Sequence, residues 1–241
     1  MDPREAIVRD RLSSVRRVIA FASSKGGVGK TCVACASALA LRELGYRVGL
    51  LDLDITNPTA HIVLGVDPRG AQIEEEKGVK PVKARGIEFM SPALFTRGEP
   101  SPLRGSEIHD AILEILAVTR WGELDFLLID APPGMADEIL DALKYVPRIE
   151  FVIVATPSPL SIDSVKRFTK FLVDEGARVL GLVENMGSGE LEPLSRALGV
   201  KYLGYVPYDP ELDRAIAEGR IDQTRFYAKI RDICRSAFHS L

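Results

Sequence analysis

Cysteine is scarce in this sequence, and the shortage limits the chemistry that the chain can perform alone. The three cysteines are Cys32, Cys35 and Cys234. So few thiols exclude a disulfide framework and a four-thiolate metal site within one chain. The three histidines, His61, His109 and His239, show no metal-ligand spacing among themselves. The sequence therefore predicts no transition-metal site built from its histidines.

Long apolar runs and an excess of basic charge are also missing. The formal net charge is −3, so no global basic field favours a nucleic-acid partner. No run approaches a membrane-spanning length, and the first residues contain no apolar signal core. We therefore expect a cytoplasmic protein without a membrane or nucleic-acid partner. The 241 residues, 46% of them hydrophobic, suffice for one large domain with a substantial core.

A glycine-rich stretch is the most informative part of the sequence. Residues 22–31 read ASSKGGVGKT, after an apolar run and before a helix-favouring one. The glycines let backbone N–H groups point inward, and a helix N-terminus adds partial positive charge, as a phosphate requires. Lys30 is expected to reach the β- and γ-phosphates and Thr31 to hold a magnesium ion. We predict a site for ATP or ADP with Mg²⁺, formed by Ser24, Lys25, Gly26, Gly27, Val28, Gly29, Lys30, Thr31 and Cys32.

This phosphate loop departs from the usual G-x-x-x-x-G-K-[ST] pattern. Ser24 stands where the first glycine belongs, and a second lysine, Lys25, precedes the double glycine. A glycine-rich turn with a solvated lysine is the simpler alternative. The order of strand, loop and helix favours the nucleotide site, because that context is what the motif needs.

Two further predicted strands end in carboxylates. Residues 47–54 read RVGLLDLD and end in Asp52 and Asp54, and residues 124–130 read LDFLLID and end in Asp130. Strand ends of a parallel sheet face the ligand crevice. Asp54 is therefore the candidate for orienting the attacking water, and Asp52 and Asp130 are candidates for supporting Mg²⁺. The Pro-Pro-Gly turn at 132–134 is a candidate sensor of the γ-phosphate.

Later strands supply candidates for binding the base. Asn185 follows a buried strand, and its amide offers a donor and an acceptor that match adenine. Pro207 lies in a Tyr-Val-Pro-Tyr segment that could form a wall beside the base. The alternation of strands and helices predicts an α/β fold, a doubly wound and mostly parallel sheet flanked by helices.

Amphipathic segments lie at both ends of the chain. Residues 1–16 form a predicted helix with an apolar edge at Val8, Leu12 and Val15, followed by a single ATPase domain over 17–241. That edge could pack on its own domain or serve as a handle for a partner. The last helix could pack on the sheet or lie on a membrane surface, with one apolar face at Phe226, Ile230, Ile233, Ala237 and Leu241.

Together these motifs resemble the deviant P-loop ATPases that include MinD, ParA, the nitrogenase iron protein and the Mrp group. The Mrp-type features are residues 25–31, 52–58, 121–125, 130–134 and 184–186. The resemblance implies a homodimer that closes over two ATP molecules, with Lys25 reaching the partner's phosphates. It further implies that Lys30 and Thr31 bind the nucleotide of their own subunit. Slow hydrolysis would then set how long the dimer stays closed.

The sequence departs from the Mrp-type iron–sulfur carriers after Asn185. Those carriers have a CxxC pair there, whereas residues 186–192 read MGSGELE, without cysteine. Met135-Ala136 also replaces the expected Thr-Gly pair. An Mrp-like body without these ligands resembles the archaeal MinD-type HypB factor of nickel–iron hydrogenase maturation. That resemblance implies a small nickel- and zinc-binding partner, similar to HypA, and a metalloenzyme client.

Two other functions stay open at this point. Cys32 and Cys35 have CxxC spacing and could replace the missing pair in an iron–sulfur carrier, although buried structural cysteines are favoured directly behind a phosphate loop. A MinD- or ParA-like ATPase that positions cargo on a membrane or DNA is the third hypothesis. The basic and apolar terminal helix is its only support.

Overall fold

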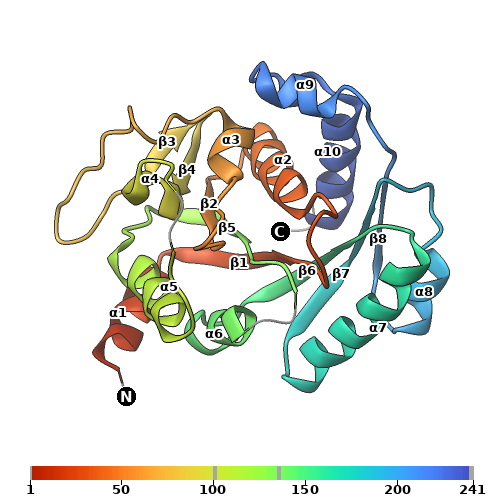
Figure 1. The fold of residues 1–241 in the computed structure, drawn as a ribbon, viewed down its shortest axis with the longest axis horizontal. Helices are drawn as coiled ribbons and strands as arrows, with labels where there is room; N and C mark the ends of the chain where they lie inside the picture. Colours follow the sequence, from red (N-terminus) through yellow and green to blue (C-terminus); the bar gives the residue numbers. More distant parts are fainter. Residues whose placement is uncertain (1, 100–101, 135–136, 239–241) are drawn as a thin grey trace.

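A single eight-stranded sheet forms the centre of the protein. The computed structural model describes residues 2–99, 102–134 and 137–238. The strand order is β3-β4-β2-β5-β1-β6-β7-β8, and every pair is parallel except β3 with β4 (Figure 1). The strands are β1 Val15–Ala22, β2 Val48–Asp52, β3 Val82–Ala84, β4 Ile87–Met90, β5 Leu124–Asp130, β6 Glu150–Ala155, β7 Arg178–Asn185 and β8 Tyr202–Val206. The predicted doubly wound, mostly parallel sheet is confirmed.

Helices cover both faces of this sheet. The face with α2, α3, α9 and α10 and the face with α1, α5, α6, α7 and α8 lie on opposite sides in Figure 1. Their bounds are α1 Pro3–Arg11, α2 Lys30–Glu43, α3 Ala60–Leu64, α4 Pro92–Thr96, α5 Ser106–Val118, α6 Asp137–Tyr145, α7 Pro159–Asp174, α8 Glu192–Ala197, α9 Leu212–Ala217 and α10 Arg225–Phe238, with a 3₁₀ turn at Ile221–Gln223.

The central strand β1 shows why the sequence reads as a buried strand. Its side chains alternate between two cores, because successive residues of a strand point to opposite faces. Ile19 and Phe21 join the core beneath α2 and α10, and Val18 and Ala20 join the core beneath α1, α5 and α6. Both faces are covered, so the strand is apolar along most of its length.

The N-terminal helix packs on its own domain. Asp2 caps α1 by accepting a hydrogen bond from the Arg4 N–H at 2.9 Å, and Pro3 occupies the first turn. Val8 is fully buried and Leu12 is 6% exposed, in the core that α1 shares with α5. The apolar edge is therefore covered by the chain itself, so the alternative of a partner handle on this edge is wrong for this conformation.

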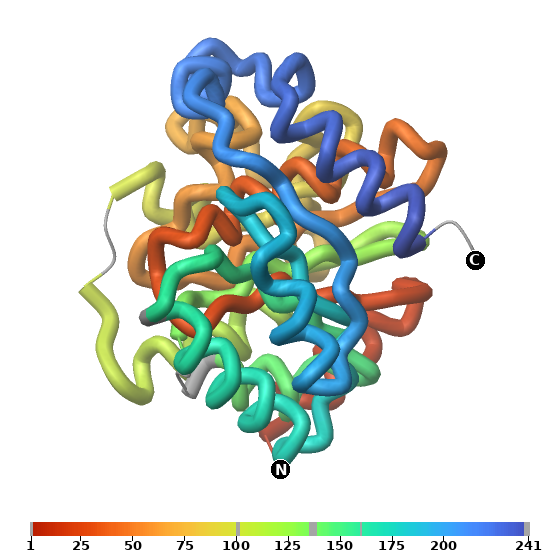
Figure 2. The backbone as a smooth tube through the Cα atoms, turned by 90° about the vertical axis from the view of Figure 1, so that its right-hand side faces the viewer, coloured from red at the N-terminus to blue at the C-terminus, as the bar shows by residue number. Residues whose placement is uncertain are grey.

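The C-terminal helix α10 packs along α2, on the opposite side of the sheet from α1 (Figure 2). Phe226, Ile230, Cys234 and Phe238 are its buried apolar residues. This burial removes the apolar face that the membrane-surface alternative requires. Leu241, the last residue of the predicted face, lies outside the described residues. Of the helices that the structure describes, none has both the length and the hydropathy to cross a membrane.

Candidate nucleotide-binding site

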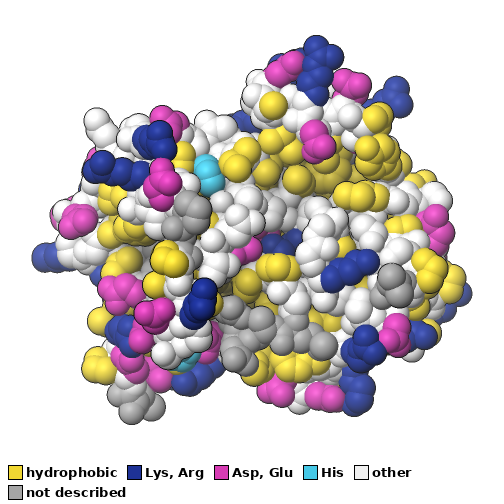
Figure 3. Space-filling view, in the orientation of Figure 1, with side chains coloured by type: hydrophobic (Ala, Val, Ile, Leu, Met, Phe, Trp, Pro, Cys, Tyr) yellow, Lys and Arg dark blue, Asp and Glu magenta, His cyan; other side chains and the backbone are white. Residues whose placement is uncertain are grey.

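The phosphate loop lies at the carboxyl edge of the sheet, between β1 and α2. Gly27 and Gly29 have φ angles of 78° and 79°, in the left-handed region that favours glycine. A Cβ atom on Gly29 would lie 2.3 Å from Nδ2 of Asn185, so a side chain does not fit there. The loop opens into a hollow on this face, with acidic and basic side chains at its centre (Figure 3).

Lys30 forms a buried ion pair with Asp130. The Lys30 side chain is 7% exposed, and its ammonium contacts Oδ1 of Asp130. The Thr31 hydroxyl donates to Oδ2 of the same carboxylate at 2.7 Å. The end of β5 and the start of α2 are therefore joined through one carboxylate. The structure brings together three of the residues that the sequence predicted for the phosphates and Mg²⁺.

Asp52 and Asp54 lie at the end of β2, beside β5, but they differ in environment. Asp52 is fully buried and accepts hydrogen bonds from the backbone N–H groups of Asp54 and Ala60, both at 3.1 Å. Asp54 is half-buried and accepts from the Thr56 hydroxyl at 3.2 Å and the Asn57 N–H at 3.0 Å. Asp54 is therefore the carboxylate that solvent and a bound phosphate can reach.

Burial raises the pKa of both inner carboxylates, Asp52 and Asp130. Burial and the nearby Asp130 charge raise the pKa of Asp52 to about 8. Burial raises the pKa of Asp130 as well, while the Lys30 ammonium opposes the rise. A divalent cation would favour the ionised form of both. Thr31, Asp52 and Asp130 offer hard oxygen atoms, which fit Mg²⁺ held by a few protein ligands, phosphates and water.

The hard oxygen donors of this site argue against a soft metal there. Among the residues that the structure describes, no group of three or more His, Cys, Asp or Glu side chains is placed to hold a metal ion. Cys35 is fully buried, and burial raises its pKa well above the ordinary value. Burial also raises the pKa of Cys32, to about 11. Both therefore stay protonated at neutral pH, as the structural interpretation of this pair predicts.

Backbone hydrogen bonds join two segments to the site, the residues after β2 and the Pro-Pro-Gly turn. The Leu53 N–H donates to the Asp130 carbonyl at 2.9 Å, and the Gly134 N–H donates to the Ser23 carbonyl at 2.9 Å. The segment after β2 is thus joined to β5, and the Pro-Pro-Gly turn to the phosphate loop. Met135-Ala136, the departure noted above, lies outside the described residues.

The side chains of Ser24 and Lys25 contact serine side chains in the N-terminal part of α7. The Lys25 ammonium donates to the Ser158 hydroxyl at 3.3 Å, and the Ser24 and Ser164 hydroxyls lie 2.9 Å apart. This docking by serine side chains was not predicted from the sequence. The serine spacing at 158, 161 and 164 was its only signal. Lys25 must leave Ser158 before it can reach a neighbouring molecule.

Asn185 and Pro207 take different positions around the site. Nδ2 of Asn185 donates to the Val28 carbonyl at 2.8 Å, so its amide supports the phosphate loop in this structure. Pro207 lines a cavity of about 670 Å³ formed by the segment after β8, by α9 and by residues around the 3₁₀ turn, together with Arg214 and Arg220. The roles of both residues in base recognition stay predictions.

Sequence reasoning missed Glu184. Its buried carboxylate accepts from the N–H groups of Gly189, Glu190 and Leu191 at 2.8–3.1 Å and from the Tyr202 hydroxyl at 2.8 Å. A Cβ on Gly187 would lie 1.9 Å from Oε1 of Glu184. One carboxylate therefore closes the loop in which the Mrp-type resemblance places a cysteine pair. The signal available in the sequence was an acidic residue near the end of a buried strand.

Comparison with known proteins extends over nearly the whole chain. Residues 14–237 match the model of the ParA family described as NUBPL iron-transfer P-loop NTPase. The chain is 34% identical over 221 residues to the iron-sulfur cluster carrier protein of Aquifex aeolicus, covering 85% of this chain and 61% of that protein. It is 36% identical over 231 residues to the carrier of Saccharolobus solfataricus, covering 86% and 76%. It is 35% identical over 232 residues to bovine cytosolic Fe-S cluster assembly factor NUBP2, covering 87% and 85%.

Solved structures agree with this assignment. A nucleotide-binding protein of Archaeoglobus fulgidus in complex with ADP has a TM-score of 0.77 and 30% identity, covering 91% of this chain and 93% of that one. MinD of Pyrococcus horikoshii with Mg-ADP has a TM-score of 0.68 at 21% identity, covering 92% and 96%, and shows the shared fold.

The fold and the site define a P-loop NTPase whose side chains fit a nucleotide with Mg²⁺, as predicted. More particularly, the chain belongs to the ParA family of P-loop NTPases, in the NUBPL iron-transfer group. The relatives support the iron–sulfur alternative over the hydrogenase interpretation that the sequence analysis put first. They give no support to a HypA-like partner.

Proposed function

We propose that this protein is an ATP-driven switch in iron–sulfur cluster assembly. The match to iron-transfer relatives over residues 14–237, together with the phosphate loop and its two carboxylates, carries the proposal. The chain spans 61% of the length of the Aquifex carrier but 85% of bovine NUBP2. We place it in the cytosol, by analogy with that bovine relative.

In this proposal each site residue has one role in ATP hydrolysis. Lys30 exchanges its partner Asp130 for the β- and γ-phosphates, while Thr31 and Asp130 turn to Mg²⁺, with Asp52 behind them. The metal ion neutralises charge on the phosphates. Asp54 orients the attacking water, because it is the half-buried carboxylate at the strand ends. Phosphoryl transfer needs such positioning and charge stabilisation more than covalent chemistry.

The proposed active form is a homodimer. Among the residues that the structure describes, the Lys25 ammonium has one hydrogen-bond partner, the Ser158 hydroxyl. Released from Ser158, it would neutralise charge on the nucleotide of the partner subunit. Closing of the dimer then depends on ATP, and hydrolysis reopens it. Partner binding would follow the nucleotide state.

The cluster itself is not held on the loop after β7. Residues 186–192 contain no cysteine, and the Glu184 carboxylate fills the space beneath that loop. The remaining thiols of the chain are buried or half-buried, and burial raises their pKa. We therefore propose that a partner supplies the thiolate ligands and that this chain supplies the nucleotide-dependent step.

Nickel insertion into hydrogenase is the second candidate. The cysteine-free sequence at 186–192 favours it, because nickel delivery by a separate metal-binding partner needs no cluster ligands on the ATPase. Both candidates share the ATP switch and differ in the cargo. A pull-down of the tagged protein from its native host, with ATP or ADP present, separates them.

The expected result is capture of a partner with bound iron and acid-labile sulfide, in amounts that change between ATP and ADP. Capture of a small nickel- and zinc-binding protein would instead select the second candidate. Anaerobic reconstitution of the purified chain with iron and sulfide is the companion test. We expect a colourless, iron-free protein, and a stable cluster on this chain alone would contradict the division of labour proposed here.

A further inference from the structure

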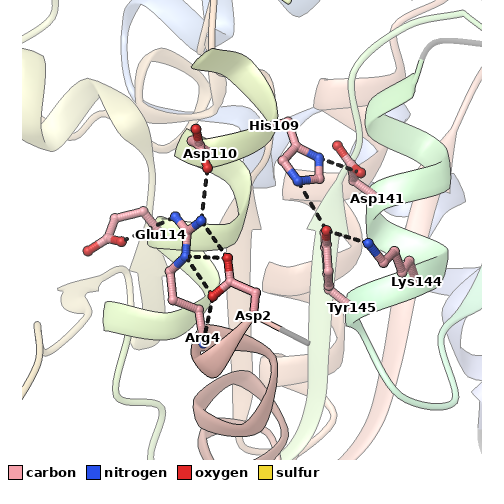
Figure 4. Close-up of polar contacts among 8 residues, drawn as sticks. All are labelled: Asp2, Arg4, His109, Asp110, Glu114, Asp141, Lys144 and Tyr145. Atoms are coloured by element: carbon pink, nitrogen blue, oxygen red, sulfur yellow. Dashed lines mark hydrogen bonds and ion pairs between the residues drawn. The ribbon is translucent and has the colours of Figure 1, made fainter. Parts of the chain in front are cut away.

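A chain of four polar side chains joins α5 to α6 outside the phosphate site (Figure 4). Nδ1 of His109 lies 2.8 Å from Oδ1 of Asp141, and Nε2 lies 3.1 Å from the Tyr145 hydroxyl. The Lys144 ammonium donates to the same hydroxyl at 2.8 Å. We call these four residues the His109 clamp.

The partners of His109 fix its tautomer. An ionised carboxylate only accepts hydrogen bonds, so Nδ1 carries the proton that binds Asp141. Nε2 then accepts from the Tyr145 hydroxyl, whose oxygen accepts from Lys144. The imidazole therefore pairs both of its nitrogens, one with α6 residue Asp141 and one with Tyr145 at the end of the same helix.

Two residues of the clamp are buried in the contact between α5 and α6. Tyr145 is 4% exposed and Asp141 is 8% exposed. The His109 and Tyr145 rings also meet edge to face, with centroids 5.6 Å apart. A fully paired polar chain in a partly buried contact specifies one arrangement of two helices, whereas apolar side chains tolerate sliding.

The residue before His109 reaches the nucleotide site. Ile108 lines a cavity of about 290 Å³ whose other walls are residues 53–57 and the two prolines at 132–133. Asp54, which we propose as the water-positioning residue, lies on the same wall. The chain that leaves Pro132–Gly134 enters α6 at Asp137. The His109 clamp therefore joins α5, which carries Ile108, to α6, the helix that follows the Pro-Pro-Gly turn.

We propose that His109 is a positioning residue for ATP hydrolysis. By fixing α5 to α6, it holds Ile108 against residues 53–57 and 132–133, so that the two segments respond together when the γ-phosphate binds. His109 touches no substrate and acts through Ile108 and α6. The inference deepens the proposed function and rests on the role given there to Asp54.

The chain offers a matched control on the same helix. Asp110, next to His109, accepts from Arg4 at 2.8 Å and joins α5 to α1 instead of α6 (Figure 4). Its side chain is 61% exposed. Asp110→Asn thus removes one charged contact of α5 without touching the clamp.

Steady-state ATPase kinetics test the proposal. We expect His109→Phe, which keeps a ring but loses both hydrogen bonds, to lower kcat about 10-fold with KM within about twofold of wild type, because small misplacements near a reacting water are costly. His109→Asn retains a donor near the Nδ1 position and should recover part of the loss. Tyr145→Phe removes only the hydroxyl and gives a milder variant. Asp110→Asn should match wild type, and a kcat of His109→Phe equal to that of Asp110→Asn would overturn the proposal.

Hydrogen exchange provides a readout that does not depend on turnover. With ADP replaced by a slowly hydrolysed ATP analogue, wild type should change its protection at residues 53–57 and 139–145 together. In His109→Phe, residues 53–57 should still respond while 139–145 should not. An unchanged response of 139–145 in this variant would refute the clamp. Wild-type ATPase turnover in Asp54→Ala would refute the proposed role of Asp54 instead. The hydrogen-exchange result would still test the role of His109.

Discussion

The Lys30 ammonium and the Asp130 carboxylate form an ion pair with each other. Both side chains are almost wholly buried, and Asp130 also accepts from Thr31 at 2.7 Å. A buried charge without a partner is costly, so each holds the other in place until a ligand arrives. A bound phosphate offers Lys30 a new anion, and Mg²⁺ offers Asp130 a new cation. Binding therefore exchanges partners at this site without leaving a buried charge unpaired.

Lys30→Ala should abolish tight nucleotide binding. Loss of a charge-assisted hydrogen bond costs about 1.5–3 kcal/mol, so we expect Kd for ATP to rise about 10-fold or more. Isothermal titration with ATP and Mg²⁺ measures it. Lys25→Ala, which removes the neighbouring lysine held by Ser158, should bind ATP nearly as well but dimerise or turn over poorly. Equal losses of ATP affinity in the two variants would show that Lys30 and Lys25 do not have the separate roles proposed here.

Asp54→Ala should separate binding from hydrolysis. Within the described part of the chain, the half-buried carboxylate accepts hydrogen bonds from Thr56 and the Asn57 N–H and from no residue of the phosphate loop, so we expect its loss to leave that loop intact. We expect kcat to fall about 100-fold or more, as for removal of a positioned base or water-orienting group, with ATP affinity within about threefold of wild type. Phosphate-release kinetics and nucleotide titration measure the two effects. Wild-type kcat in this variant would reassign the water-positioning role.

Asp52 should make the nucleotide-free protein less stable as the pH rises. Its pKa is raised from 3.8 to about 8 in the folded state by burial and by the charge of Asp130. The stabilisation from Asp52 is fully present below the pKa of the unfolded state and is lost as the pH rises through the pKa of the folded state. Between these two pKa values folding binds one extra proton, so the free energy of unfolding falls by at most about 1.4 kcal/mol per pH unit from this group.

Urea unfolding in the presence of EDTA, at about pH 5 and about pH 8, measures this dependence. Asp52→Asn cannot ionise and should have a flatter profile than wild type. Mg-ATP should remove much of the pH dependence, because a cation favours the ionised carboxylates. Identical profiles for Asp52→Asn and wild type would exclude Asp52 as its source.

Glu184→Gln should destabilise the fold. The buried carboxylate accepts from three backbone N–H groups and from Tyr202, and an amide presents donors to some of them. Each unsatisfied buried group costs about 1–3 kcal/mol, so we expect a loss of about 2 kcal/mol in the free energy of unfolding. Glu211→Gln, at an exposed position away from this loop, should change it by less than about 0.5 kcal/mol. A similar loss in both variants would show that the effect is not specific to Glu184.

The thiols should be inert in the folded protein. Burial raises the pKa of Cys32 to about 11 and that of Cys234 to about 12, and Cys35 is fully buried. The reactive thiolate is therefore rare at neutral pH. A thiol reagent should label the native protein slowly and all three cysteines after unfolding. Rapid labelling of native Cys32 would reopen the possibility of thiolate chemistry at the CxxC pair.

Local patterns made much of the fold predictable. The strand, glycine turn and helix around residues 22–31 predicted the phosphate loop because each element is specified by neighbouring residues. Carboxylates at strand ends were expected to meet, because parallel strands end at one edge of a sheet. Lys30, Thr31 and Asp130 do meet there. The antiparallel strand β3 was not predicted, because its three residues carry too little pattern.

Long-range side-chain contacts could not be predicted in the same way. The docking of Lys25 on Ser158 joins residues 133 positions apart, and that of Ser24 on Ser164 joins residues 140 apart. Asn185 looked like a base-reading amide from its own chemistry, yet its donor supports the Val28 carbonyl. Which of several possible partners a polar side chain takes depends on the tertiary fold, and spacing along the sequence does not encode it.

The Glu184 carboxylate has a consequence for how the protein responds to metal supply. In a small metal-dependent fold, the loop that binds the ion gains its structure from that ion, and folding then depends on metal concentration. Here backbone N–H groups at 189–191 and the Tyr202 hydroxyl are tied to a permanent part of the chain. The switch should therefore keep its conformation and melting temperature when chelators remove iron or nickel, and remain ready for cargo when none is present.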